Sequence, residues 1–234
     1  ARGDLGVEIP LELVPRAQKM LIAKANRAAI PVITATQMLR SMVDNPRPTR
    51  AEVSDVANAI LDGTDAVMLS EETAIGKHPV KAVQVMHLVA ADTEREFDHR
   101  SWMNRHHPQG ELSFEAAVAH TAVEMAHDIG AAAIITCTKS GSTTRNVAMY
   151  RPRQVLLTIT PNENTARRTG LTFGAVPLLI DTVESAEDLE RAAIDQALQG
   201  GYVKPGQYVV ITAGIPFGEG GSTNMIKVSV AEYC

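Results

Sequence analysis

The chain has 234 residues, 45% of them hydrophobic, and a formal net charge of −5 at pH 7, which fits one or two globular domains with a sizeable core. Scattered Lys and Arg residues and only 4% aromatic residues exclude a typical nucleic-acid-binding surface. The longest apolar run, 131–137, is far shorter than the roughly 20 residues of a membrane helix. Two widely separated cysteines fit a reducing cytosol better than a disulfide scaffold. We therefore expect a cytoplasmic protein without nucleic-acid or membrane partners.

The chain opens on an acidic motif flanked by glycines, Arg2-Gly3-Asp4-Leu5-Gly6, with neither an initiator Met nor a strand before it. This start predicts that the chain is the back part of a larger protein. A Gly-Asp-x-Gly turn would let backbone N–H groups approach an anion while the Asp4 carboxylate reaches a cation. The alternative is an Asx-type turn that only joins two elements, which is the more common use of an isolated Gly-Asp pair.

Residues 11–98 alternate between helical and apolar segments, as in βα units around a parallel sheet. A capping box at Thr49 and Glu52 opens one helix, and Pro79 opens the next. The pattern predicts three helices and two buried strands: helices over 13–29, 49–61 and 79–96, and strands over 31–35 and 66–69.

A rise in charged and polar residues after Glu94 interrupts this alternation, so we place a domain boundary there. Three histidines near the boundary, His99, His106 and His107, lack Cys or carboxylate partners at metal-ligand spacing. A solvated linker is therefore favoured over a metal site. The predicted organisation is a first domain over 1–98, a linker over 99–111 and a second domain over 112–234.

The second domain repeats the βα alternation. A glycine-rich loop over 214–222, between the last two strands, suits a ligand loop better than a tight hairpin. The expected helices cover 113–129, a short segment ending near 150, 163–169 and 185–199; the expected strands cover 132–136, 154–159, 176–180, 208–212 and 225–230.

Polar residues gather at three strand ends in the first domain. Gly3-Asp4, Thr36 and the segment Ser70–Thr73 follow, or are inferred to follow, successive parallel strands. In (β/α)8 barrels the ligand site is built from such strand ends, so motifs about 30 residues apart converge on one pocket. Each motif alone could be a helix N-cap, but three in register favour a ligand site.

Several long motifs of the chain resemble those of the pyruvate kinase family, in the same order and at the same spacing. They are Ala1–Pro10, Ala35–Leu39, Pro46–Glu52, Ser54–Ala59 and Met68–Ala74. The topology after residue 110 is similar too, so the resemblance covers essentially the whole chain. It implies an α/β fold, in which the last βα units of a TIM (β/α)8 barrel are followed by a three-layer α/β C-terminal domain with a mostly parallel five-stranded sheet.

The resemblance implies transfer of a phosphoryl group from phosphoenolpyruvate to ADP, giving pyruvate and ATP. The implied metals are Mg²⁺ or Mn²⁺, and K⁺, whose ligands are not in this chain. Asp4 matches the metal ligand and, with the Gly3 amide and the Thr36 hydroxyl, the substrate contacts. Ser70 and Glu72 match groups of the water network that protonates the enolate of pyruvate. Such a transfer depends on positioning and on neutralising negative charge. Family members are usually homotetramers.

The sequence departs from the family pattern in ways that bear on activity. The family's catalytic Lys and second metal-ligating Glu lie on the preceding barrel strand, and much of its ADP site lies earlier still; none of these is in the chain. Glu71 stands where a Gly is frequent, and Arg40 where a Glu is frequent. We therefore expect the chain to be inactive by itself.

A second phosphate site is expected in the second domain. Thr138-Lys139-Ser140-Gly141-Ser142-Thr143 follows a strand and precedes a helix, so hydroxyls, a Lys and helix-terminal N–H groups would converge on one anion. The alternative is a polar strand-to-helix turn. A resemblance to the sugar-phosphate effector loop of pyruvate kinases favours binding.

The loop over 214–222 bears on which effector would bind. Pro216 and Phe217, followed by Glu219, stand where relatives that respond to fructose 1,6-bisphosphate carry Trp and Arg. A second phosphate would lack an Arg fork and would face a carboxylate. We therefore expect a sugar-monophosphate or nucleotide-monophosphate effector, or none.

Two other functions remain open on the sequence alone. The chain could be a non-catalytic phosphometabolite-binding module with a regulatory or assembly role. It could also belong to another barrel enzyme that handles phosphoenolpyruvate or pyruvate, but that function leaves the segment Thr138–Thr143 unexplained.

Overall fold

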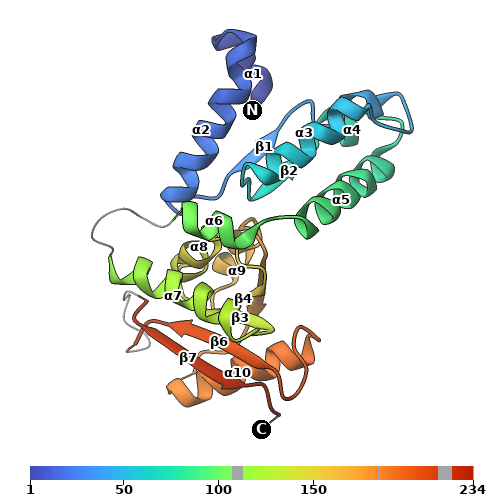
Figure 1. Cartoon of the computed structure of the whole chain (residues 1–234). Coiled ribbons are helices and arrows are strands. Elements are labelled where there is room, and N and C mark those ends of the chain that lie inside the picture. Colours follow the sequence, from blue (N-terminus) through green and yellow to red (C-terminus); the bar gives the residue numbers. More distant parts are fainter. Residues whose placement is uncertain (107–112, 184, 216–222, 234) are drawn as a thin grey trace. The chain divides into compact units, whose positions relative to one another are not determined.

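The computed structural model describes residues 1–106, 113–183, 185–215 and 223–233. The chain divides into two compact units, residues 1–98 (unit 1) and residues 99–234 (unit 2) (Figure 1). Each unit combines helices with mainly parallel strands, so the expected α/β class is confirmed. Among the described helices, none is both long enough and apolar enough to cross a bilayer.

Unit 1 contains two strands paired in parallel, β1 (Ile33–Ala35) and β2 (Ala66–Met68). In the register of this pair, Ala35 lies opposite Met68, so both strands end at the same edge. The helical elements of the unit are α1 (Arg2–Glu8), η1 (Leu11–Leu13), α2 (Val14–Arg27), η2 (Arg40–Val43), α3 (Arg50–Leu61), α4 (Glu71–Ala74) and α5 (Pro79–Arg95).

The predicted capping box at the start of α3 is confirmed. The Thr49 hydroxyl accepts a hydrogen bond from the Glu52 backbone N–H, and the Glu52 carboxylate accepts one from the Thr49 N–H at 2.7 Å. These bonds satisfy N–H groups that have no partner inside the helix. The apolar face of α3 packs with η2 and α5 around Met38, Leu39, Met42, Val56, Ala59, Ile60, Ala82 and Met86.

Two expectations for unit 1 were wrong. Residues 2–8 form helix α1 instead of a Gly-Asp turn, so Gly3 and Asp4 lie in a first helical turn. The strands are only partly buried: Ile33 is 43% and Met68 46% exposed. A two-stranded parallel sheet has two open edges, which leaves part of each strand exposed.

Unit 2 contains the five-stranded sheet that was expected, with four parallel strands and one antiparallel edge strand. The order across the sheet is β5-β4-β3-β6-β7. The strands are β3 (Ala133–Cys137), β4 (Val155–Thr160), β5 (Ala175–Leu179), β6 (Tyr208–Ala213) and β7 (Met225–Val230).

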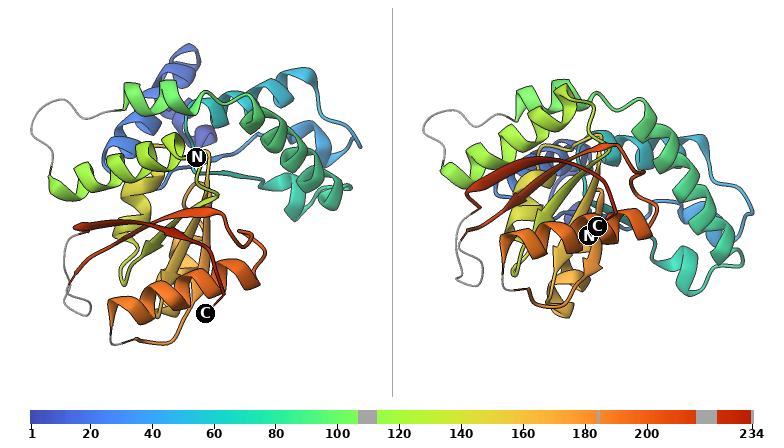
Figure 2. Two further views of the ribbon diagram at one scale, coloured as in Figure 1. Left: turned by 60° about the horizontal axis from the view of Figure 1, so that its bottom comes forward. Right: turned by 90° about the horizontal axis from the view of Figure 1, so that it is seen from below.

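Helices cover both faces of this sheet and form three layers. Helix α10 (Ala186–Gln199) packs on one face against alternate residues of β3, which include Ala133 and Ile135. Helices α7 (Phe114–Asp128) and α8 (Ser142–Ala148) lie across the sheet from α10 in both views of Figure 2. Helix α9 (Glu163–Thr169) packs against β4 and β5.

The stretch expected as a linker over 99–111 contains a packed helix, α6 (His99–Arg105), which belongs to unit 2. Trp102 is 4% exposed, and its indole N–H donates to the Met149 carbonyl at 3.0 Å. The His106 ring stacks on the Trp102 ring with centroids 3.9 Å apart. Burial of this aromatic side chain holds the segment against the unit in spite of its polar composition. The rest of the predicted linker, from residue 107, lies outside the described residues.

Glu190 on α10 joins the helix to strand β7. Its carboxylate accepts hydrogen bonds from Lys227 and Ser229, both at 2.5 Å. Burial raises the pKa of Glu190, but these bonds and the charge of Lys227 outweigh burial and hold the pKa below its usual value of 4.5. The ionised carboxylate is therefore the form that the fold favours.

We expect Glu190→Gln to lower the free energy of unfolding of unit 2 at pH 7 by about 0.5–1 kcal/mol, because an ion pair at a partly exposed site is screened by water. A lowered pKa stabilises the fold above pH 4.5, and this contribution disappears as the pH falls through the folded pKa. The difference between variant and wild type should therefore shrink below pH 4.5. Urea denaturation followed by the fluorescence of Trp102, the single Trp, measures it.

The matched control is Glu187→Gln, an exposed position on the same helix. It should leave the pH profile of stability as in wild type. A Glu190→Gln difference that stays constant from pH 7 to pH 3 would contradict the assignment.

Candidate functional site

The parallel register of β1 and β2 brings the residues that follow both strands to one edge of the sheet. Thr36 comes directly after β1, and Ser70 comes two residues after β2. Helix α1 supplies a third segment, because the Gly3 backbone N–H donates to the Thr36 hydroxyl at 2.9 Å. The structure thus joins two of the predicted substrate-binding groups.

The backbone at Thr36 is strained. Thr36 has φ +71° and Gln37 has φ +54°, so two consecutive residues other than glycine adopt the left-handed region. A β-branched residue in this region is an outlier, and such strain persists only where the surrounding structure imposes it. Backbone strain of this kind is common at binding sites, which agrees with a functional role for the segment after β1.

Asp4 lies next to Gly3 in the first turn of α1, and its side chain is exposed. Among the described residues, no group of three or more His, Cys, Asp or Glu side chains could hold a metal ion. Mg²⁺ commonly takes only one or two protein carboxylates and completes its shell with water and substrate oxygens. The exposed carboxylate of Asp4 is suited to supply one ligand of such a Mg²⁺ site.

Ser70 and Glu72 also lie at this edge. Glu72 connects the loop that follows β2 to the loop that follows β1. Glu72 is 1% exposed, and its two carboxylate oxygens accept from the Leu39 N–H at 2.9 Å and the Ser70 N–H at 2.8 Å. A buried carboxylate needs such donors. Glu72 therefore ties the two strand-end loops together, whatever part it takes in chemistry.

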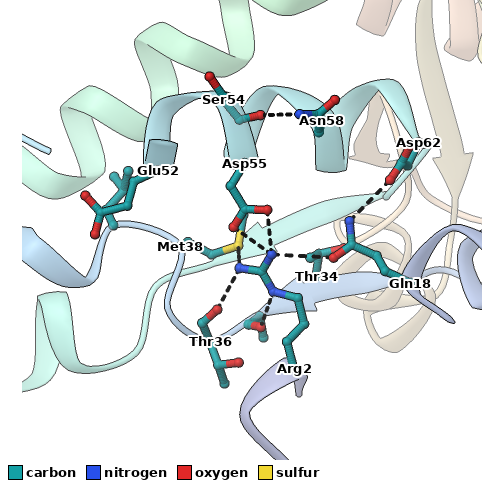
Figure 3. Close-up of polar contacts among 12 residues, drawn as sticks. Arg2, Gln18, Thr34, Thr36, Met38, Glu52, Ser54, Asp55, Asn58 and Asp62 are labelled. Carbon is teal, nitrogen blue, oxygen red and sulfur yellow. Dashed lines mark hydrogen bonds and ion pairs between the residues drawn. The ribbon is translucent and has the colours of Figure 1, made fainter. Parts of the chain in front are cut away.

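Sequence reasoning did not identify Arg2 as a site residue, yet its guanidinium lies among the segments of this site (Figure 3). Arg2 pairs with the Asp55 carboxylate on α3 and donates to the backbone carbonyls of Ala35 and Thr36. The one available signal was its place directly before Gly3 and Asp4, which did not reveal a partner 53 residues away.

Arg40 and Glu71, the two positions expected to differ from the family pattern, contact each other. Arg40 and Glu71 form an ion pair with Nε and Oε2 3.0 Å apart, and both side chains are about half exposed. The positive charge of Arg40 is thus balanced by the negative charge of Glu71. A pair this exposed contributes little to stability, in the range of about 0–1 kcal/mol.

In unit 2, the predicted phosphate loop connects β3 to α8. Gly141 has φ +81°, and its N–H donates to the Thr138 hydroxyl at 3.0 Å. The hydroxyls of Ser140 and Ser142 are 3.0 Å apart. Lys139 and Ser140 are exposed, and Lys139 borders an open pocket of about 430 Å³ together with Pro161, Asn162, Glu163 and Thr182.

Thr143, the last residue of the predicted set, differs from the others. It is 4% exposed, and its hydroxyl forms a 2.6 Å hydrogen bond with the Thr223 hydroxyl. Helix geometry turns Thr143 toward the interior, while Ser140 precedes the helix at the surface. Thr143 therefore holds the loop in place, and its hydroxyl does not reach the exposed face.

Cationic side chains beside the loop were also missed by sequence reasoning. Arg145 donates to the Ser140 carbonyl at 3.3 Å, which places its guanidinium at the loop. Burial, and secondly the charge of Arg168, lowers the pKa of Arg145. Two like charges held near each other favour the approach of an anion.

The second half of the predicted effector site, residues Pro216, Phe217 and Glu219, lies outside the described residues. The loop is described up to Ile215 and from Thr223. Asn224 closes it at this point, because its amide exchanges hydrogen bonds with the Ile215 backbone at 2.8 and 2.7 Å.

The fold and the strand-end site define an α/β protein whose polar groups gather where parallel strands end, as in barrel enzymes. Two family models match the chain: "Pyruvate kinase, barrel domain" over residues 1–83 and "Pyruvate kinase, alpha/beta domain" over residues 116–229. The chain therefore belongs to the pyruvate kinase family.

Relatives agree with this assignment. The chain is 50% identical over 230 residues to a pyruvate kinase of Geobacillus stearothermophilus, with 98% of the chain and 39% of the relative covered. It is 46% identical over 232 residues to a pyruvate kinase of Clostridium acetobutylicum, with 99% of the chain and 49% of the relative covered. The chain thus spans less than half the length of these relatives.

A solved structure agrees as well. The crystal structure of a pyruvate kinase from Cryptosporidium parvum matches the chain with a TM-score of 0.92 and 39% identity. The match covers 99% of the chain and 46% of that structure. The expected fold, a piece of a pyruvate kinase barrel followed by an α/β domain, is confirmed.

The loop geometry at Gly141 generates a stability prediction. A Cβ at this position would lie 2.8 Å from Thr169 Cγ2, whereas a Cβ at Gly174, which also has a positive φ, would meet no atom within 4 Å. Both Ala variants strain the backbone, but only Gly141→Ala adds a clash. We expect it to destabilise unit 2 by about 1–3 kcal/mol more than Gly174→Ala, as measured by urea denaturation with Trp102 fluorescence. Equal losses would contradict the packing described here.

Proposed function

We propose that this chain forms part of a pyruvate kinase that transfers a phosphoryl group from phosphoenolpyruvate to ADP, giving pyruvate and ATP in the cytoplasm. The proposal rests on the hydrogen bond that the Gly3 amide donates to the Thr36 hydroxyl at 2.9 Å, next to the exposed Asp4 carboxylate. The Thr36 hydroxyl accepts from the Gly3 N–H and keeps its own proton to donate to a substrate carboxylate, and the Gly3 N–H would turn to that carboxylate when the substrate binds. The Asp4 carboxylate next to them can share the cation of the substrate.

In this proposal, Gly3 and Thr36 hold the carboxylate of phosphoenolpyruvate, and Asp4 is a ligand of Mg²⁺ or Mn²⁺. The bound metal would neutralise charge on the transferring phosphoryl group. Ser70 and Glu72 position the loops around the reacting enolate and take part in the water network that protonates it. The K⁺ ligands, the catalytic Lys and most of the ADP site would come from residues outside this chain, and the working enzyme would be a homotetramer.

We expect the 234-residue chain alone to show no turnover in a lactate-dehydrogenase-coupled assay, and the complete gene product to be active. In the complete product, Asp4→Asn should lower kcat by about 10²–10³-fold, because it removes charge stabilisation at the reacting phosphoryl group. Glu8→Gln, an exposed position on the same helix, is the matched control and should leave kcat unchanged.

Turnover by the chain alone well above background would contradict the incomplete site. A complete gene product that binds phosphometabolites without turnover would favour the alternative, a non-catalytic module with a regulatory or assembly role.

A second proposal concerns the segment Thr138–Thr143 of unit 2, which we infer to be an effector phosphate site. Exposed Lys139 and Ser140, the Ser142 hydroxyl and the neighbouring Arg145 supply cationic and hydrogen-bonding groups. Lys139 also borders an open pocket. These groups suit a single phosphate. The acidic residue Glu219, in the loop over 214–222, argues against a second phosphate.

We therefore expect ribose 5-phosphate or AMP to bind the chain more tightly than fructose 1,6-bisphosphate does, as measured by isothermal titration calorimetry. Lys139→Gln should weaken monophosphate binding by about tenfold, because it removes a charged donor. Lys204→Gln, at an exposed position elsewhere in unit 2, should not change it. Tighter binding of the bisphosphate would sink the monophosphate assignment.

A further inference from the structure

Arg2 links three segments of unit 1 that are distant in the sequence (Figure 3). Its side chain, which is 15% exposed, extends from the first turn of α1. Nη1 contacts both carboxylate oxygens of Asp55 on α3, at 2.7 and 2.6 Å. Nε donates to the Ala35 carbonyl at 3.3 Å, and Nη2 donates to the Thr36 carbonyl at 2.7 Å. One guanidinium thus holds α1, the end of β1 and α3 together.

The two carbonyls that Arg2 contacts lie on either side of the strained Thr36 N–Cα bond. Thr36 has φ +71°, a conformation that a β-branched residue adopts only under constraint. Donors fixed on successive carbonyls oppose a return of the chain to an extended conformation. Arg2 therefore supplies a constraint of the kind that the strained backbone requires.

The strained conformation has a direct consequence for the site. It places the Thr36 hydroxyl 2.9 Å from the N–H of Gly3, the residue that follows Arg2. Movement of the Thr36 backbone would separate these two polar groups, although neither of them is changed. The side chain of Arg2 extends toward Asp55 on α3, as Figure 3 shows.

The contacts require arginine specifically. The guanidinium uses Nε, Nη1 and Nη2 on three different acceptors at once. A planar fork with five donors can do this, whereas the single ammonium of lysine acts from one point. Asp55 supplies the counter-charge that makes a mostly buried guanidinium acceptable.

We propose that Arg2 is a positioning residue of the strand-end site: with Asp55 it holds Thr36 in its left-handed conformation and so keeps the Thr36 hydroxyl against the Gly3 amide. Arg2 does not touch the substrate in this proposal. The proposal concerns the shape of the free site, and its effect on phosphoenolpyruvate rests on the proposed function.

The first experiment is hydrogen–deuterium exchange on the 234-residue chain, which needs no catalysis. Arg2→Lys and Asp55→Asn should each speed exchange of the amides of residues 36–39 by about tenfold, while the amides of α3 remain protected. Arg16→Lys, an exposed arginine on α2, is the matched control and should leave exchange unchanged. Unchanged exchange at 36–39 in Arg2→Lys, or loss of protection throughout unit 1 in both variants, would overturn the proposal.

The second experiment measures kinetics of the complete gene product. Arg2→Lys should raise the KM for phosphoenolpyruvate by about tenfold and leave the KM for ADP within about twofold of wild type. A general loss of stability would instead lower the amount of active enzyme and change neither KM. A KM for phosphoenolpyruvate equal to wild type would overturn the proposal. If Arg2→Lys speeds exchange at 36–39 but the complete gene product shows no turnover, Arg2 keeps its role in shaping the site and the proposed reaction is rejected.

Discussion

Parallel pairing of β1 with β2 brings the ends of both strands to one edge, and the candidate site of unit 1 depends on this pairing. Thr36 and Ser70 are 34 positions apart in the sequence, so local structure alone does not bring them together. The pairing also allows Glu72 to accept hydrogen bonds from both loops. Unit 2 uses the same principle, because β3 ends at the predicted phosphate loop.

Two ion pairs add contacts between the segments that the pairing of β1 with β2 brings together. Arg2 with Asp55 joins α1 to α3, and Arg40 with Glu71 joins the two loops at the strand ends. In the first pair the Arg2 side chain is 15% exposed and has several acceptors in fixed positions, so it can determine backbone conformation. The second is half exposed and mainly balances charge. The same kind of interaction therefore has different consequences according to its burial.

Local sequence patterns predicted most of the secondary structure. The capping box of Thr49 and Glu52 and the strands of both units follow from short-range rules, and each is confirmed. Other expectations failed where distant contacts outweighed local composition. Residues around Trp102 look like a polar linker, yet the indole is buried in unit 2. Gly3 and Asp4 look like a turn, yet they begin a helix.

The sequence by itself determined the family, the βα rhythm and the set of polar residues at strand ends, because these depend on motifs and on periodicity along the chain. Only the tertiary structure decided which of those residues meet. It joined Gly3 to Thr36, turned Thr143 inward and brought Arg2 to Asp55. Contacts between residues far apart in the chain depend on how elements pack, and packing geometry is not encoded in any short segment.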